Sequence, residues 1–223
     1  MDAHELAEKL RNKQGTYDEL LQWCEETVDN MDLNNPDCQY LYDRAIRYMM
    51  QGRITNLTEK EATIMTKYLS KSYMHEKGLD DRITVNVLDW ENFIKRHKSD
   101  KLNGMCTTLK GTRFILDYSP NVIEGLMSGN RDKFMDALKT IYHETAHVIQ
   151  ESSIALPEIN GRKVHYVSSL YEIALENTAR KADSKFYDEN YSNLVLENQA
   201  NKIRTNKRLF SHFKICPSIK KIL

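Results

Sequence analysis

The spacing of apolar residues changes near residue 82, and this change constrains the fold more than any other feature of the chain. Before it, apolar side chains recur every three or four residues, as in residues 59–77, which favours amphipathic helices. Residues 82–90, RITVNVLDW, instead alternate and are rich in β-branched side chains, which predicts a strand. Residues 105–119, MCTTLKGTRFILDYS, place two such arms around Lys110-Gly111 and predict a β-hairpin. We therefore expect an α+β fold in which helices precede a small, mostly antiparallel sheet.

Capping signals mark the starts of the expected helices. Thr or Asn before an apolar-periodic stretch accepts hydrogen bonds from the first free backbone N–H groups, and a Glu three residues later completes a capping box. A proline at the first helical position is also favourable. The candidates are Thr16 with Glu19, Asn35 before Pro36, Thr58 with Glu61, and Asn130 before a long helix over residues 131–152.

The chain divides into three predicted regions. Residues 1–80 form an N-terminal helical region, residues 81–190 form the core with the sheet, and residues 191–223 form a basic C-terminal segment. Residues 198–223 hold seven Lys or Arg and no Asp or Glu. They contain few aromatic residues and no recognisable nucleic-acid module, so we expect a solvated tail rather than a polyanion-binding surface.

Composition points to a cytoplasmic globular protein. Lys plus Arg and Asp plus Glu each number 32, so the overall charge indicates neither a polyanionic nor a membrane partner. The start, MDAHELAEKLRNK, lacks the apolar stretch of a signal peptide, and no apolar run approaches the roughly 20 residues of a membrane span. The four cysteines form no CxxC pair, which fits free thiols in a reducing compartment.

The long predicted helix contains the segment IYHETAHVIQ, residues 141–150. His143 and His147 are four residues apart, so both imidazoles project from one face and can reach the same point. Neutral imidazole nitrogen is a good ligand for zinc, and catalytic zinc sites take three protein ligands and a water. Glu144 lies about 100° further around the helix, beside such a metal, where it can accept a proton from the bound water. This is the HExxH pattern of zinc peptidases, and it predicts hydrolysis of peptide bonds in a protein or peptide substrate.

A third metal ligand must come from elsewhere in the chain. A metzincin would need Gly at position 150 and His at position 153, where this chain has Gln150 and Ser153. The alternative is a carboxylate on a later helix, and Glu176 is the candidate we favour. Glu172, one turn earlier on the same face, is the other candidate, or an acceptor for a ligand histidine.

Residues HETAHVIQ followed by ENTAR resemble the HExxH…ExxA pattern of gluzincin-type metallopeptidases, including the ImmA/IrrE-like group and related small phage and mobile-element zincins. The resemblance covers about residues 82–185. It implies a zincin-like fold with one zinc ion, His143 and His147 as ligands, Glu144 as general base and Glu176 as third ligand. Many relatives have Asp or Asn after the ExxA motif, where this chain has Arg180.

Other residues are candidates for supporting roles. His165, Tyr166 and Tyr171 are possible donors to the developing oxyanion. The arm at residues 112–119, TRFILDYS, could be an edge strand that pairs with extended substrate; the simpler interpretation is an ordinary sheet strand, and the two are compatible. We expect the isolated histidines to be surface residues or to have hydrogen-bond partners within the fold. These are His4, His75, His97 and His212.

Three alternatives to a peptidase remain from the sequence. The same fold can serve as a non-catalytic zinc-binding regulatory module. A nucleic-acid-associated protein acting through residues 198–223 is less favoured, because only the charge of that segment supports it. A cysteine nucleophile built from Cys106 and His165 has only the residue types in its favour.

Overall fold

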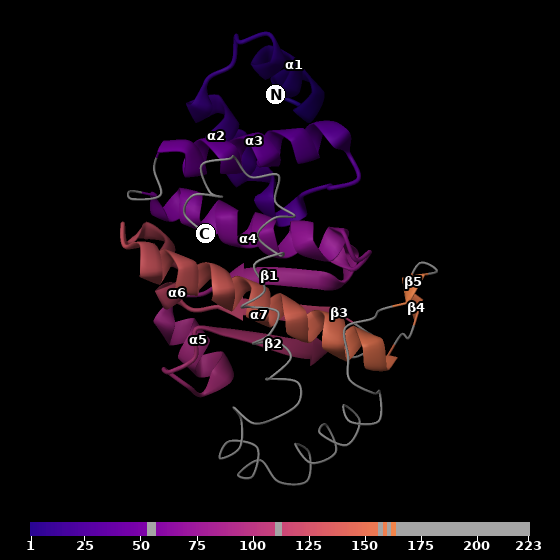
Figure 1. The fold of residues 1–223 in the computed structure, drawn as a ribbon, viewed down its shortest axis with the longest axis vertical. Helices are drawn as coiled ribbons and strands as arrows, with labels where there is room; N and C mark the ends of the chain where they lie inside the picture. Colours follow the sequence, from indigo (N-terminus) through magenta and orange to yellow (C-terminus); the bar gives the residue numbers. More distant parts are fainter. Residues whose placement is uncertain (53–56, 110–112, 156–157, 160–161, 164–223) are drawn as a thin grey trace.

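The described residues form an α+β fold with seven α-helices and a mixed three-stranded sheet. In this computed structural model they are residues 1–52, 57–109, 113–155, 158–159 and 162–163. Four helices come first in the chain: α1 (Ala3–Arg11), α2 (Tyr17–Thr27), α3 (Pro36–Gly52) and α4 (Glu59–His75). Figure 1 shows α1 to α3 at one end of the molecule, with α4 between them and the sheet.

The predicted caps of these helices are confirmed. Thr16 with Glu19 and Thr58 with Glu61 both form complete capping boxes, in which each side chain binds the other residue's backbone N–H. The Asn35 side chain accepts hydrogen bonds from the first backbone N–H groups of α3. The long helix α7 (Arg131–Ala155) starts in the same way, since the Asn130 side chain accepts from the backbone N–H groups of residues 132 and 133.

The sheet contains β1 (Ile83–Val87), β2 (Gly104–Leu109) and β3 (Arg113–Tyr118), in the order β1-β3-β2. The hairpin prediction is confirmed, because β2 and β3 pair antiparallel, with Gly104 opposite Tyr118. β1 pairs parallel with β3, so the sheet is mixed rather than mostly antiparallel. The reason is the crossover between β1 and β2, which carries the chain to the far side of β3.

The strand prediction for residues 82–90 was wrong at its C-terminal end. β1 stops at Val87, and helix α5 (Trp90–His97) follows. Asp89 causes the change, because its side chain accepts a hydrogen bond from the Asn92 backbone N–H at 2.8 Å and thereby caps the helix. α5 forms the crossover between the two edges of the sheet.

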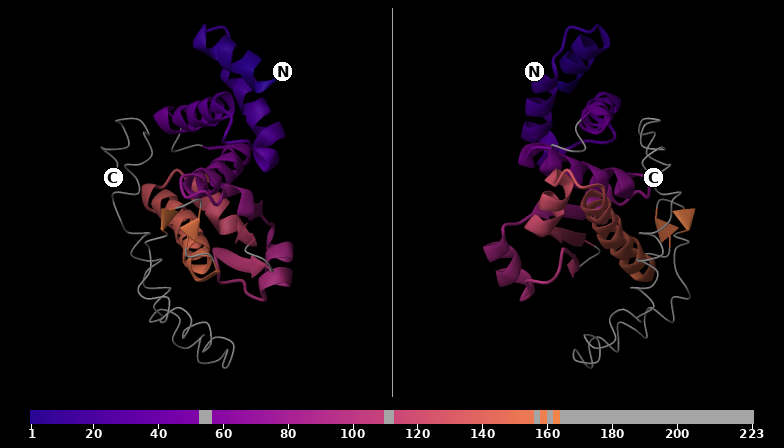
Figure 2. Two further views of the ribbon diagram at one scale, coloured as in Figure 1. Left: turned by 90° about the vertical axis from the view of Figure 1, so that its right-hand side faces the viewer. Right: turned by 60° about the vertical axis from the view of Figure 1, so that its left-hand side comes forward.

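The two faces of the sheet carry different helices, because successive side chains of β3 point to opposite faces. Phe114, Leu116 and Tyr118 are buried on the face that packs against α4 and α7. Asp117 points to the other face and binds Arg96 and His97 of α5. Figure 2 shows α5 and α7 on opposite sides of the strands.

A single hydrophobic core runs from α1 to α7. It includes residues on both sides of position 80, and α4 contacts the N-terminal helices, β1 and α7. This shared core does not test the predicted boundary between residues 1–80 and 81–190. The predicted basic segment, residues 191–223, lies outside the described residues. Helix α6 (Pro120–Met127) packs beside α7, and β4 (Glu158–Ile159) and β5 (Arg162–Lys163) form a short antiparallel pair after it. Within the described part of the chain, no helix combines the length and the apolar character needed to cross a membrane.

Candidate metal centre

Helix α7 is buried on all sides where it carries the HExxH motif. Every residue from Ile141 to Ile149 is buried, because α4, α6 and β2 pack around this part of the helix. His143, Glu144 and His147 are 8%, 7% and 9% exposed. Two imidazoles and a carboxylate on consecutive turns of a buried helix are costly to desolvate unless they bind a partner, and such clusters mark functional sites.

The two imidazoles converge on one point. The Nε2 atoms of His143 and His147 are 3.1 Å apart, and the ring planes are inclined at 87°. Two tetrahedral ligands, each about 2.0–2.1 Å from a zinc ion, lie about 3.3 Å apart. The observed separation is close to this value, so both nitrogens can bind one ion without moving the helix. Without the ion, one ring donates a hydrogen bond to the other.

Glu144 lies directly beneath the start of β2. A Cβ atom added to Gly104 would be 2.7 Å from Glu144 Cγ, 3.1 Å from Cδ and 3.2 Å from Oε1. The Gly104 backbone therefore covers the glutamate side chain, and only a residue without a side chain permits this approach. The sequence motif does not indicate this contact, because the two residues are 40 positions apart.

A buried tyrosine links the sheet to the start of the motif. The Tyr118 hydroxyl lies 3.0 Å from Ser70 Oγ of α4 and donates to the Ile141 carbonyl oxygen of α7 at 3.3 Å. Complete burial raises the pKa of Tyr118 well above its ordinary value, the hydrogen bond with Ser70 opposes this rise, and the nearby Glu144 charge adds to it. The phenol therefore stays protonated and keeps its donor role. Our sequence analysis did not identify Tyr118 as part of the site.

A hollow of about 260 Å³ lies along α7 beside the motif. Thr140, one turn before Glu144, and Asn103, next to Gly104, both line it. The other lining residues come from α6 and α7: Asn121, Val122, Glu124, Gly125, Lys133, Asp136 and Ala137. The hollow thus continues the face of α7 on which Glu144 lies.

The edge of the sheet nearest the motif is β2. Because β3 pairs with β1 on one side and β2 on the other, the arm at residues 112–119 is not an edge strand, and that alternative was wrong. Within the described residues no further strand pairs with β2. An extended peptide that adds to this sheet beside Glu144 would have to pair with β2.

The remaining predicted site residues lie outside the described residues. These are Glu172 and Glu176, the two candidates for the third ligand, and His165, Tyr166 and Tyr171. Among the residues that are described, no three His, Cys, Asp or Glu side chains converge as a metal site. Comparisons with models of protein families, with characterised proteins and with solved structures gave no match.

Three of the isolated histidines have acidic partners, as expected. His4 binds Asp37, His75 binds Asp80, and His97 binds Asp117, each at 2.8–3.0 Å. They contribute to packing between elements rather than to the HExxH cluster. His212 lies outside the described residues.

Proposed function

We propose that the protein is a zinc-dependent metallopeptidase with a zincin-like fold and that Glu144 is its general base. The observation that supports this most directly is the 3.1 Å separation of the His143 and His147 Nε2 atoms on a buried helix turn. Glu144 lies on that turn, with the Gly104 backbone against its side chain. The donor set, two neutral imidazoles with a carboxylate beside them, fits zinc better than a hard oxygen-preferring ion.

Each residue of the proposed site would have a separate role in the reaction. His143 and His147 would hold zinc, with Glu176 as the proposed third ligand and Glu172 as the alternative. Bound there, zinc would polarise the scissile carbonyl and lower the pKa of a water molecule towards neutrality. Glu144 would accept the proton from that water and return it to the leaving nitrogen. His165, Tyr166 and Tyr171 are the proposed donors to the developing oxyanion.

The surroundings of Glu144 suggest how a substrate would lie. An extended peptide would pair with the β2 edge, because backbone hydrogen bonds to an edge strand recognise any sequence. The start of β2 is next to Glu144, so such a peptide would pass the general base. The hollow that Asn103 and Thr140 line would then accept one of its side chains.

Four variants test the metal and the base separately. We expect Glu144→Gln to retain stoichiometric zinc, measured by mass spectrometry of the metal, and to lose at least about a hundredfold in cleavage of a mixed peptide library. His143→Ala and His147→Ala should lose zinc and cleavage together. Glu91→Gln makes the same chemical change at an exposed position on α5 and should behave as the unaltered protein.

Two results would contradict the proposal. Full cleavage by Glu144→Gln would show that Glu144 is not the general base. Stoichiometric zinc in the unaltered protein without cleavage of any library peptide would favour the non-catalytic zinc-binding module instead. The same metal measurement on Glu176→Ala and Glu172→Ala decides between the two candidates for the third ligand, because only the variant that lacks the true ligand should lose zinc.

A further inference from the structure

Helix α3 carries a row of arginine and tyrosine side chains far from the HExxH motif. Tyr40, Arg44, Arg47 and Tyr48 are spaced by four, three and one residues, so they share one side of the helix. With Asp43 they line a hollow of about 240 Å³, which we call the α3 hollow. Helix α3 lies with α1 and α2 at the end of the molecule opposite to α5 (Figure 1).

Arg44 is held in place by the two tyrosines. Its Nη1 donates to the Tyr40 hydroxyl at 2.7 Å and its Nη2 donates to the Tyr48 hydroxyl at 3.1 Å. The guanidinium carbon lies 5.9 Å and 5.4 Å from the centroids of the two rings. Fixing a long side chain before binding reduces the entropy that a ligand complex must lose. The guanidinium is therefore preorganised for a partner.

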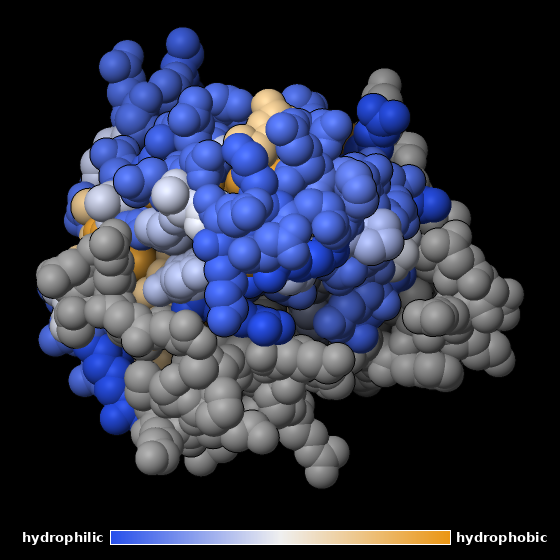
Figure 3. Space-filling model, turned by 90° about the horizontal axis from the view of Figure 1, so that it is seen from above, coloured by the Kyte–Doolittle hydropathy of each residue, from blue (hydrophilic) through white to orange (hydrophobic). Residues whose placement is uncertain are grey.

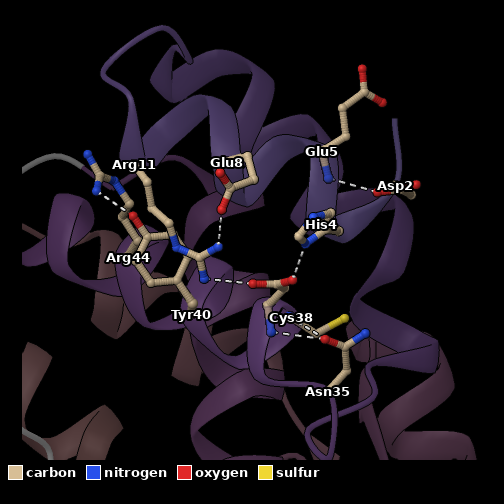
Figure 4. Close-up of polar contacts among 10 residues, drawn as sticks. Asp2, His4, Glu5, Glu8, Arg11, Asn35, Cys38, Tyr40 and Arg44 are labelled. Atoms are coloured by element: carbon tan, nitrogen blue, oxygen red, sulfur yellow. Dashed lines mark hydrogen bonds and ion pairs between the residues drawn. The ribbon is translucent and has the colours of Figure 1, made fainter.

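Within the described part of the chain, no ion pair balances the positive charges of the α3 hollow. Arg11, which stacks on the same Tyr40 ring at 4.7 Å, binds Glu8 and Asp37 (Figure 4). Among the described residues, in contrast, no carboxylate lies within ion-pair distance of Arg44 or of Arg47. The Arg44 Nε–H is buried and makes no hydrogen bond there. Two guanidinium groups thus face one carboxylate, that of Asp43, which already accepts the hydroxyl hydrogen of Tyr68.

We propose that the α3 hollow is a docking site for an acidic segment of a protein partner. A guanidinium binds a carboxylate through parallel hydrogen bonds, and Tyr and Arg are the residue types enriched where partners bind tightly. Figure 3, seen from this end, shows that the described surface there is mainly hydrophilic with small hydrophobic spots.

A protein partner fits the α3 hollow better than a nucleic acid. Nucleic-acid surfaces need several cations spaced along successive phosphates. Here Arg11 is neutralised by its own carboxylates, and the carboxylate of Asp43 lines the hollow itself. Two remaining guanidinium groups match one or two carboxylates of a peptide.

A binding assay with a defined probe tests the proposal, and it requires neither zinc nor cleavage. The probe is a short fluorescein-labelled peptide that alternates glutamate with serine, and the comparison peptide has glutamine instead of glutamate. We expect the full chain to bind only the first peptide in fluorescence anisotropy. Arg44→Gln combined with Arg47→Gln should weaken binding about tenfold or more, the effect of losing charge-assisted hydrogen bonds.

Two further variants control for charge and folding. Lys95→Gln combined with Lys101→Gln removes the same charge at exposed positions near α5 and should change affinity by less than about twofold. Arg47→Gln alone alters a side chain that is exposed, so the fold is preserved, and it should weaken binding about threefold or more. Equal binding by the double arginine variant, no binding by the unaltered chain, or tighter binding of single-stranded DNA of equal charge would each overturn the proposal.

Discussion

Replacing Gly104 by alanine tests the contact between β2 and Glu144, which an isolated HExxH helix would not make. The added methyl group would be 2.7 Å from Glu144 Cγ, whereas ordinary contacts begin at 3.4 Å. The strand or the glutamate must therefore move by about 0.7 Å, and overpacking of this kind costs about 1–3 kcal/mol in the free energy of unfolding. In the proposed peptidase, a displacement near 1 Å at a reacting group would also lower turnover by about a hundredfold.

A double-mutant cycle with Glu144→Ala isolates this contact. Glu144→Ala removes all three atoms that the new methyl group would meet. We therefore expect Gly104→Ala to lower the free energy of urea unfolding by about 1–3 kcal/mol in the unaltered chain. In the Glu144→Ala background the cost should be less than about 0.5 kcal/mol. The difference between the two values is the energy of the clash.

Gly125→Ala is the matched control. Its added Cβ would be 3.0 Å from Ala137 Cβ and 3.1 Å from the Lys133 carbonyl oxygen, so it crowds α7 without touching Glu144. Gly125→Ala should lower the free energy of unfolding by the same amount in the unaltered chain and in the Glu144→Ala variant. Equal costs of Gly104→Ala with and without the Glu144 side chain would refute the packing of β2 on Glu144, the proposed general base. If the proposed zinc site is present, its zinc content should not change in either glycine variant, because neither alters His143 or His147.

Two other predictions concern acidic residues. Asp117→Asn should lower the free energy of urea unfolding by about 2–4 kcal/mol, because a fully buried carboxylate that binds Arg96 loses its charge. Asp136→Asn, at an exposed position, is the control and should lower the free energy of unfolding by less than about 1 kcal/mol. The His4 pKa is raised above 6.5, chiefly by its hydrogen bond with Asp37, so the stability it contributes is full below 6.5 and is lost as the pH rises through the raised value. The Asp37 pKa is lowered by the same bond, so its contribution is present above 3.8 and is lost as the pH falls through the lowered value. An NMR titration should find the His4 pKa returning towards 6.5 in Asp37→Asn, and an unchanged value would contradict the pairing.

Features that depend on a few neighbouring residues could be predicted from the sequence. The capping boxes at Thr16 and Thr58 are confirmed because both partners are three residues apart. The convergence of His143 and His147 follows from the helix repeat in the same way. Helix α5 was not predicted, although its capping signal at Asp89 is also local. The alternating strand pattern that precedes Asp89 was taken to continue through this capping residue.

Features that depend on the path of the chain could not be predicted in this way. The arm at residues 112–119 has the same sequence whether it lies at an edge or in the centre of a sheet. Its central place follows from the crossover through α5, which puts β1 and β2 on opposite sides. Strand pairing partners are set by such long-range connections and by burial, neither of which a periodic pattern contains.

The sequence by itself determined most element types, the caps of the predicted helices and the placement of two histidines and a glutamate on one helix, because helix and strand periods act over a few residues. Only the tertiary structure decided what surrounds that glutamate. Gly104 comes from a strand 40 positions earlier, and the Tyr118 hydroxyl reaches the helix from the central strand. Both contacts require a sheet, its crossover and a helix buried on all sides to be assembled together. The environment of the proposed catalytic base is therefore a property of long-range packing, while its place in the motif is a property of local spacing.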